Sequence, residues 1–211
     1  MAALGRRYSS VRRGCMKKEH TLLKVLAEAR ACTVCASVLP LGAKPLLAAD
    51  PAAKILIIGQ APGKATHEAG IPWRDRSGDR LRDWLGVSSE QFYDPRLIAI
   101  VPTGFCYPGS GASGDLPPRP ECAPLWHPRI LPLLTKLKLT IYLGSFAFEA
   151  NLNGSYRNLS EAAEKFNELL PDRIVLPHPS PRNGMWASQR PWFSEELLPA
   201  LRKRIRELLS E

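Results

Sequence analysis

The amino-acid sequence predicts an α/β fold, a three-layer α/β/α sandwich around a four-stranded parallel sheet. Short and mostly apolar runs predict the strands, at residues 54–58, 97–101, 139–143 and 173–176. Each run is followed directly by a glycine or a proline, and segments with helical periodicity separate the runs. Continuous apolar runs are typical of strands buried in a parallel sheet, and strands that alternate with helices form such sheets.

Apolar stripes and capping residues place the helices around these strands. Leucine-rich stripes predict a first helix over residues 20–31 and a last helix that reaches Leu209. Ser160 is the expected N-cap of a helix that ends near Leu170, and Ser194 is the expected N-cap of the last helix. The other expected helices cover residues 78–86, 121–136 with three interrupting prolines, and 145–152.

Residues 20–211 are expected to form a single domain, preceded by a basic tail at residues 1–19. The net charge is +9, and residues 1–18 hold six Lys or Arg and no acid. The tail therefore carries most of the excess positive charge. The charge of the remaining chain is only a weak argument for nucleic-acid binding. We expect a solvated, disordered extension, with an organelle transit segment as the alternative. No apolar run is long enough to span a membrane.

Two loops stand out because each directly follows a predicted strand. They are residues 59–63 and residues 178–183, and the carboxyl ends of parallel strands share one edge of a sheet, where α/β proteins bind ligands. The first loop is not a nucleotide-binding P-loop, since only three residues separate its glycines and Ala65 stands where a hydroxyl is required. In the second, His178 lies between two prolines, where an imidazole of fixed direction can stabilise negative charge. The alternative is a histidine that is simply hydrogen-bonded at a strand end.

Four cysteines suit a metal centre. Cys32 and Cys35 form a C-x-x-C turn. Cys106 and Cys122 flank a proline-rich segment: Cys106 lies within residues 102–120, and Cys122 lies just after them. Cysteines without a secretory signal favour a reducing compartment, where thiols ligate metal or stay free. Four thiolates suit a [4Fe-4S] cluster or a structural zinc ion, and spacing alone does not choose between them. Four buried free thiols are the remaining alternative. A long loop such as 102–120 is usually functional or tied down.

These features together resemble a known family. The matching segments are Gly59-Gln60-Ala61-Pro62-Gly63, Gly70-Ile71-Pro72-Trp73, Arg76-Ser77-Gly78 with Leu81, and His178-Pro179-Ser180. With the cysteine layout, they resemble uracil-DNA glycosylases, and most closely the thermostable iron–sulfur class, which reads G-E-A-P-G, G-x-P-F and R-A-G. The resemblance covers about residues 28–205. It implies a uracil-DNA glycosylase-like fold and a [4Fe-4S] cluster on the four cysteines.

The resemblance also implies an activity. Such enzymes flip a damaged base out of DNA and then hydrolyse its N-glycosidic bond. Flipping is needed because that bond is inaccessible in the stacked duplex. His178 would stabilise the departing base, and Trp73 would take the stacking position that a phenylalanine usually holds, with core packing as the alternative. Ala61, Pro62 and Gly63 would wall the base pocket. The expected DNA contacts or wedge are Ser180, Pro181, Arg182 and Asn183.

The chain departs from the family pattern at two places. Gln60 stands where the related class has a glutamate, and Ala61 stands where other glycosylases have an aspartate. Gln60 is the first candidate to orient the attacking water, and His67 and Glu68 are candidates for a general base. Pro102 replaces an asparagine that reads the uracil edge, which leaves this reading to Thr103 or to the backbone of Gly104 and Phe105.

The expected function is therefore a monofunctional DNA-repair glycosylase that acts on uracil or a related deaminated base and leaves an abasic site. Hypoxanthine is an alternative base. A non-catalytic iron–sulfur DNA-binding protein on the same fold is an alternative function, and a glycosylase trapped on its product through His67 is a third. The expected partner is damaged DNA, with no membrane, and the expected state is a cytoplasmic monomer that associates with the nucleoid when it acts on DNA.

Overall fold

The computed structural model describes residues 21–112, 114–152 and 154–210, and it contains the expected parallel sheet. The four strands lie in the order β2-β1-β5-β6, and every neighbouring pair is parallel. Their bounds are β1 (Ile55–Ile58), β2 (Ile98–Ile100), β5 (Leu139–Leu143) and β6 (Arg173–Leu176). The fold class and all four predicted strands are confirmed. The predicted tail at residues 1–19 lies outside the described residues.

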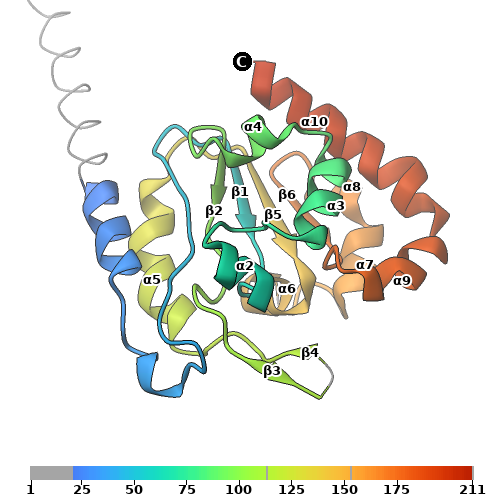
Figure 1. Cartoon of the computed structure of the whole chain (residues 1–211). Helices are drawn as coiled ribbons and strands as arrows, with labels where there is room; N and C mark the ends of the chain where they lie inside the picture. Colours follow the sequence, from blue (N-terminus) through green and yellow to red (C-terminus); the bar gives the residue numbers. More distant parts are fainter. Residues whose placement is uncertain (1–20, 113, 153, 211) are drawn as a thin grey trace, which may run out of the picture.

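Alternate residues of a strand pack into two different hydrophobic cores, one on each face of the sheet. Leu56 and Ile58 of β1 belong to one cluster of buried side chains, whereas Ile55 and Ile57 belong to the other. This alternation follows from the two-residue period of a strand. The helical residues 21–30 lie beside α5 on the first face, and α3 and α10 lie on the second (Figure 1). The helices that build these layers are α3 (Arg76–Leu85), α5 (Cys122–Ile130), α6 (Gly144–Leu152) and α10 (Leu198–Ser210).

Shorter helices and turns complete the layers and the edge of the sheet. The short α-helices are α2 (Lys64–Ala69), α4 (Ser89–Tyr93), α7 (Leu159–Glu164), α8 (Phe166–Leu169) and α9 (Gly184–Ser188). The 3₁₀ turns are η1 (Ala36–Val38), η2 (Leu131–Leu133) and η3 (Pro181–Asn183), and η4 (Phe193–Leu197) is a π-helical turn. The predicted helix over residues 121–136 is therefore split, because Pro132 lies in the first turn of η2 after α5 ends.

Two predicted N-caps are corrected. Asn158, not Ser160, caps α7, because its side chain accepts a hydrogen bond from the Glu161 N–H at 3.0 Å. The Ser160 hydroxyl instead accepts a hydrogen bond from the Trp186 indole at 2.9 Å. Ser194 lies inside η4 and donates to the Pro191 carbonyl oxygen at 3.2 Å, so it does not begin the last helix.

Residues 102–120 are not a loop without regular structure. They contain a two-stranded antiparallel hairpin of β3 (Ser110–Gly111) and β4 (Gly114–Asp115). The Leu116 N–H donates to the Gly109 carbonyl oxygen at 2.8 Å and extends the pairing beyond the two strands. Figure 1 shows it projecting below the carboxyl ends of the strands. Two-residue strands rich in glycine carry no apolar pattern that a sequence reading could detect.

The sheet order creates a switch point between β1 and β5. The chain leaves β1 for β2 on one side, whereas it leaves β5 for β6 on the other. Ligands of open α/β sheets bind outside the carboxyl ends of strands at such a point. Within the described residues, no helix combines the length and apolar character that a bilayer crossing requires.

Candidate active site

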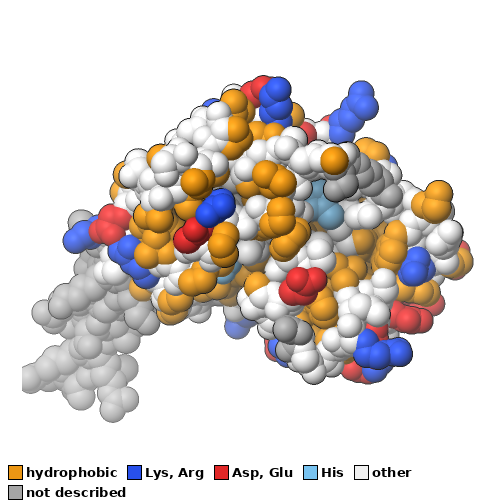
Figure 2. Space-filling view, turned by 90° about the horizontal axis from the view of Figure 1, so that it is seen from below, with side chains coloured by type: hydrophobic (Ala, Val, Ile, Leu, Met, Phe, Trp, Pro, Cys, Tyr) orange, Lys and Arg blue, Asp and Glu red, His pale blue; other side chains and the backbone are white. Residues whose placement is uncertain are grey.

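A cavity of about 1020 Å³ opens at this switch point. Residues that follow each strand line it: Gly59 after β1, Pro102 after β2, Gly144 after β5 and Pro177 after β6. Figure 2 looks onto this end of the molecule, where histidine atoms lie in a hollow bordered by hydrophobic side chains. Nine of the predicted site residues line the cavity: Gln60, Ala61, Pro62, Gly63, Trp73, His178, Ser180, Pro181 and Asn183. Arg182 lies in η3 between the last two, and the contacts predicted for its side chain lie outside what the structure describes.

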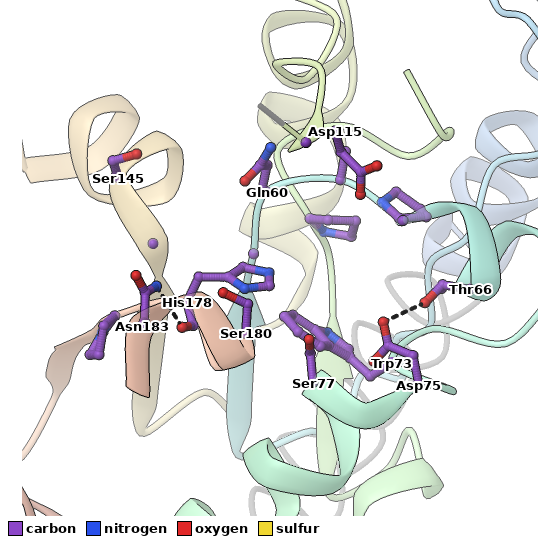
Figure 3. Close-up of a pocket in the computed structure, with 18 of the residues that line it drawn as sticks. Gln60, Thr66, Trp73, Asp75, Ser77, Asp115, Ser145, His178, Ser180 and Asn183 are labelled. Carbon is purple, nitrogen blue, oxygen red and sulfur yellow. Dashed lines mark hydrogen bonds between the residues drawn. The ribbon is translucent and has the colours of Figure 1, made fainter. Parts of the chain in front are cut away.

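The loop after β6 holds His178 in a fixed position. Both flanking prolines are buried, which limits the backbone on either side of the imidazole. The Asn183 side-chain amide donates to the His178 carbonyl oxygen at 2.8 Å, and an Arg80 guanidinium N–H donates to the Ser180 carbonyl oxygen at 3.1 Å. The loop is thus tied both to its own turn and to α3, and the imidazole points into the cavity (Figure 3).

Burial keeps the His178 imidazole neutral. Desolvation lowers its pKa below the ordinary 6.5, while the negative charges of Asp75 and Asp115 act in the opposite direction. The lowered pKa means that a neutral ring with one N–H donor prevails at neutral pH. Such a ring can donate a hydrogen bond to a carbonyl oxygen on which negative charge develops.

Trp73 lies beside His178 in a strained backbone conformation. Its φ is 58°, in the left-handed region that large side chains rarely adopt. The Tyr93 hydroxyl donates to the Trp73 carbonyl oxygen at 3.1 Å, and Arg82 donates to the same oxygen at 3.4 Å. The indole and imidazole centroids are 5.5 Å apart with a 34° tilt. Strain that is held in place by such contacts is characteristic of functional sites.

Gly59 provides the space for this indole. A Cβ atom at Gly59 would lie 2.9 Å from Cζ2 of Trp73, closer than side chains pack. The absence of a side chain therefore lets the indole lie against the end of β1. Trp73 therefore lines the cavity and also packs, partly buried, against the core on the second face of the sheet.

The residues predicted to read the base edge support the first loop from behind. The Thr103 N–H and hydroxyl both donate to the Gly59 carbonyl oxygen, at 2.8 and 2.9 Å. The Gly104 N–H donates to the Gln60 carbonyl oxygen at 2.8 Å. Neither Thr103 nor Gly104 lines the cavity, whereas Pro102 does. Their hydrogen-bonding groups are used to fix the backbone that carries Gln60.

The structure also separates His67 and Glu68 from the cavity, so neither is placed to act as the predicted general base. His67 is only 7% exposed, in α2, and its ring lies 6.0 Å from that of Tyr107. Glu68 is exposed, with one carboxylate oxygen 4.0 Å from the Lys64 ammonium. The helical turn of α2 directs these side chains away, an element that the sequence reading did not predict.

Several polar residues that line the cavity were not predicted from the sequence. Asp75 and Ser77 come from the start of α3, Asp115 from the hairpin, and Ser145 from the start of α6. The Asp75 carboxylate accepts from the Gly78 N–H at 2.8 Å, as the N-cap of α3. An aspartate directly before a helical stretch was the one available signal, because it is a preferred N-cap.

A comparison with protein families adds the decisive observation. A family model described as the uracil DNA glycosylase superfamily matches residues 48–202, a span that runs from before β1 into α10. The chain belongs to this superfamily. The match includes both loops of the cavity, Trp73 and the β3–β4 hairpin. A glycosylase-type function follows from membership of this superfamily.

This glycosylase-superfamily chain also brings its four predicted metal ligands together. Cys32, Cys35, Cys106 and Cys122 are free thiols that line a second, largely apolar pocket. The Phe105 N–H donates to Sγ of Cys122 at 3.3 Å. Burial raises the pKa of Cys122 to about 12 and also raises that of Cys106, which argues against a role as reactive nucleophiles. In the part of the chain that the structure describes, no three His, Cys, Asp or Glu side chains gather closely enough for a single metal ion.

The histidines predict a pH-dependent stability for this superfamily member. Burial lowers the pKa of His67, His127 and His178 below 6.5. The unfolded chain therefore binds more protons, and the free energy of unfolding should be fully retained above about pH 6.5 and should fall as the pH drops below it. Urea unfolding at several pH values measures this, and His127→Gln should reduce the slope. An unfolding free energy that is constant between about pH 7 and 5 would contradict the prediction.

Proposed function

We propose that the protein removes uracil, or a related deaminated base, from DNA by hydrolysing the N-glycosidic bond. The proposal rests mainly on one observation: a neutral His178 and Trp73 line the same cavity, with 5.5 Å between their ring centroids. A flat ring that stacks on the indole presents its edge to the imidazole. A pyrimidine with carbonyl oxygens offers the acceptor that this donor needs.

The chemistry follows from the positions of these groups. A base inside a duplex cannot reach the cavity, so the nucleotide must rotate out of the stack. As the glycosidic bond breaks, the electron pair leaves with the base, and the His178 N–H donates to the carbonyl oxygen that carries the growing charge. Gln60, on the loop after β1, can orient a water molecule toward the sugar carbon. No lysine lines the cavity within the described residues, which supports a reaction without strand cleavage.

DNA contacts are proposed for the loop after β6. Ser180, Pro181 and Asn183 lie at the cavity lining next to His178. Met185, which follows this loop, has a side chain that is 72% exposed. Small polar groups and backbone N–H groups at such a rim suit contacts to phosphate oxygens, which position DNA without reading its sequence.

The preferred base and the choice between catalysis and binding are tested together. Oligonucleotides with one uracil or one hypoxanthine, single- and double-stranded, are incubated with the protein and then treated with alkali. Cleavage at the damaged base only after alkali supports a monofunctional glycosylase, and the faster substrate identifies the base. Cleavage without alkali would contradict the monofunctional reaction. DNA binding without any cleavage would leave the non-catalytic alternative, which the missing carboxylates at Gln60 and Ala61 favour.

We further propose that the four thiols hold a [4Fe-4S] cluster with a structural role. The donor set fits, because such a cluster takes four thiolates on separate irons and tolerates a wider spacing than one zinc ion. Bound there, the cluster would join the loop after the first helix to the segment after β2 and the start of α5. The pocket belongs to the core that packs against the sheet, as Phe105 and Trp126 line both.

The prediction for this centre concerns Cys122→Ser. The protein purified without oxygen should contain four irons and four sulfides per chain, following the composition of the cluster type. Cys122→Ser should lose most of the iron and unfold at a lower temperature, because metal binding contributes to folding free energy. Iron and sulfide analysis with thermal unfolding measures both. Zinc in place of iron, or unchanged stability of the iron-free variant, would contradict the proposal.

A further inference from the structure

The loop that should activate water lacks an acidic side chain. Gln60 and Ala61 cannot accept a proton, since an amide oxygen is a far weaker base than a carboxylate and a methyl group has no acceptor. Water activation by a positioned base assists such reactions, even where the sugar cation forms early. A carboxylate at this loop would therefore have to come from another part of the fold.

The β3–β4 hairpin supplies one. Asp115, the last residue of β4, lines the cavity. Its Oδ2 lies 3.0 Å from the position that a Cβ on Gly63 would occupy, so the carboxylate lies directly over the loop after β1. Figure 3 shows Asp115 and Gln60 on the same side of the cavity, with Trp73 and Asp75 on the other side of His178.

Hydrogen bonds hold this carboxylate in place. The Ser110 hydroxyl donates to Oδ1 of Asp115 at 3.2 Å. Because Ser110 uses its proton there, the Tyr107 hydroxyl, 2.7 Å away, donates to the Ser110 oxygen. Tyr107 itself is buried and anchors this chain of donors to the fold. Only one carboxylate oxygen is used in the chain, and Oδ2 faces the loop of Gln60.

The hairpin and the water-orienting loop are also connected directly. The Gln60 side-chain amide nitrogen lies 3.5 Å from the carbonyl oxygen of Leu116, the residue after Asp115. With its nitrogen directed to the hairpin, the amide leaves its oxygen as an acceptor for water. The Gln60 side chain and the Asp115 carboxylate therefore both meet where the hairpin lies against the loop after β1.

Asp75 is the other carboxylate of the cavity, and its oxygens have structural partners. Oδ1 accepts from the Gly78 N–H at 2.8 Å, and Oδ2 lies 3.4 Å from the Thr66 hydroxyl. These contacts fix the start of α3 and connect it to Thr66 within α2. Asp75 therefore has a structural role, whereas Asp115 keeps one carboxylate oxygen available for the reaction.

We propose that Asp115 is the general base of the reaction, an inference that rests on the proposed glycosylase function. The water oxygen forms a bond to the sugar C1′ while its proton passes to the Asp115 carboxylate. The bond from C1′ to the base nitrogen breaks, and its electron pair leaves with the base, which His178 stabilises. The products are an abasic sugar and a base that takes up one proton.

The test compares single-turnover rates of uracil release for Asp115→Asn, Asp75→Asn and Asp172→Asn. Asp172 is exposed and precedes β6 at the opposite end of the sheet, so its variant removes the same charge far from the cavity. Asp115→Asn should lower the rate by about 100-fold or more, since general base catalysis contributes about that much. Its affinity for uracil DNA should match that of Asp172→Asn. Added formate should restore part of the rate of Asp115→Ala, because it replaces the lost carboxylate.

Each outcome bears on the proposal. An Asp115→Asn rate within about threefold of Asp172→Asn would overturn it, as would a larger loss for Asp75→Asn with formate rescue only at that position. A slow Asp115→Asn enzyme whose thermal unfolding matches the unsubstituted protein supports it. If the unsubstituted protein releases no base from any damaged DNA, the proposed function itself fails, a result distinct from equal rates in an active enzyme.

Discussion

Replacement of His178 by alanine is expected to lower the rate of base release by about 100- to 1000-fold, the size of effect that loss of one oxyanion donor has elsewhere. The neutral imidazole lies beside the Trp73 indole in the cavity, with 5.5 Å between the ring centroids. Without it, the hydrogen bond that we propose for the departing base is lost. The rate is measured under single-turnover conditions with uracil DNA.

A matched variant separates donation from shape. His178→Gln keeps a side-chain N–H donor, so it should recover part of the rate that His178→Ala loses. Both variants should bind DNA about as tightly as the unsubstituted protein, since phosphate contacts supply most of the affinity. Equal rates for His178→Ala and the unsubstituted protein would remove His178 from the chemistry.

Substitution of Gly78 by alanine is expected to have the largest effect on stability. A Cβ at this position would lie 1.8 Å from the Trp73 carbonyl oxygen and 2.6 Å from its carbonyl carbon. Both are backbone atoms, so either α3 or the strained Trp73 turn must move. Overpacking of this kind costs about 1–3 kcal/mol of unfolding free energy, and more where the backbone cannot yield. The displaced indole should also lower the rate of base release.

Gly184→Ala is the control for this substitution. Gly184 begins α9, and a Cβ there has no atom within 4 Å. Alanine is favoured over glycine in a helix by about 1 kcal/mol, so this variant should be as stable as the unsubstituted protein or slightly more so. Chemical unfolding of both variants gives the comparison. If Gly78→Ala and Gly184→Ala had equal unfolding free energies, the backbone around Gly78 would accommodate the added Cβ without loss of stability.

The sheet was predictable because its signal is local. Each strand is a short apolar run, and a run such as Ile55–Ile58 is buried on both faces, so composition alone marks it. The cavity was predictable to a similar extent, because each of its two main loops is one continuous segment that directly follows a predicted strand, β1 or β6. The parallel arrangement then brings Gln60 and His178 to one edge.

The remaining features depend on distant partners. The hairpin that carries Asp115 has exposed, glycine-rich strands, and its importance comes from its position over Gly63, which no local pattern encodes. His67 looked suitable as a base because it follows the first loop closely, but the turn of α2 buries it. Thr103 lies near the expected base-reading position, yet its donors are used by Gly59.

The identity of the released product tests the proposed reaction most directly. Uracil DNA is incubated with the protein and with His178→Ala, and the released small molecule is identified by mass spectrometry. We expect free uracil and an intact, alkali-labile backbone with the unsubstituted protein, and at least about 100-fold slower release with the variant. Tight DNA binding with no free base, from uracil or hypoxanthine DNA, would contradict it and identify a binding protein on a glycosylase fold.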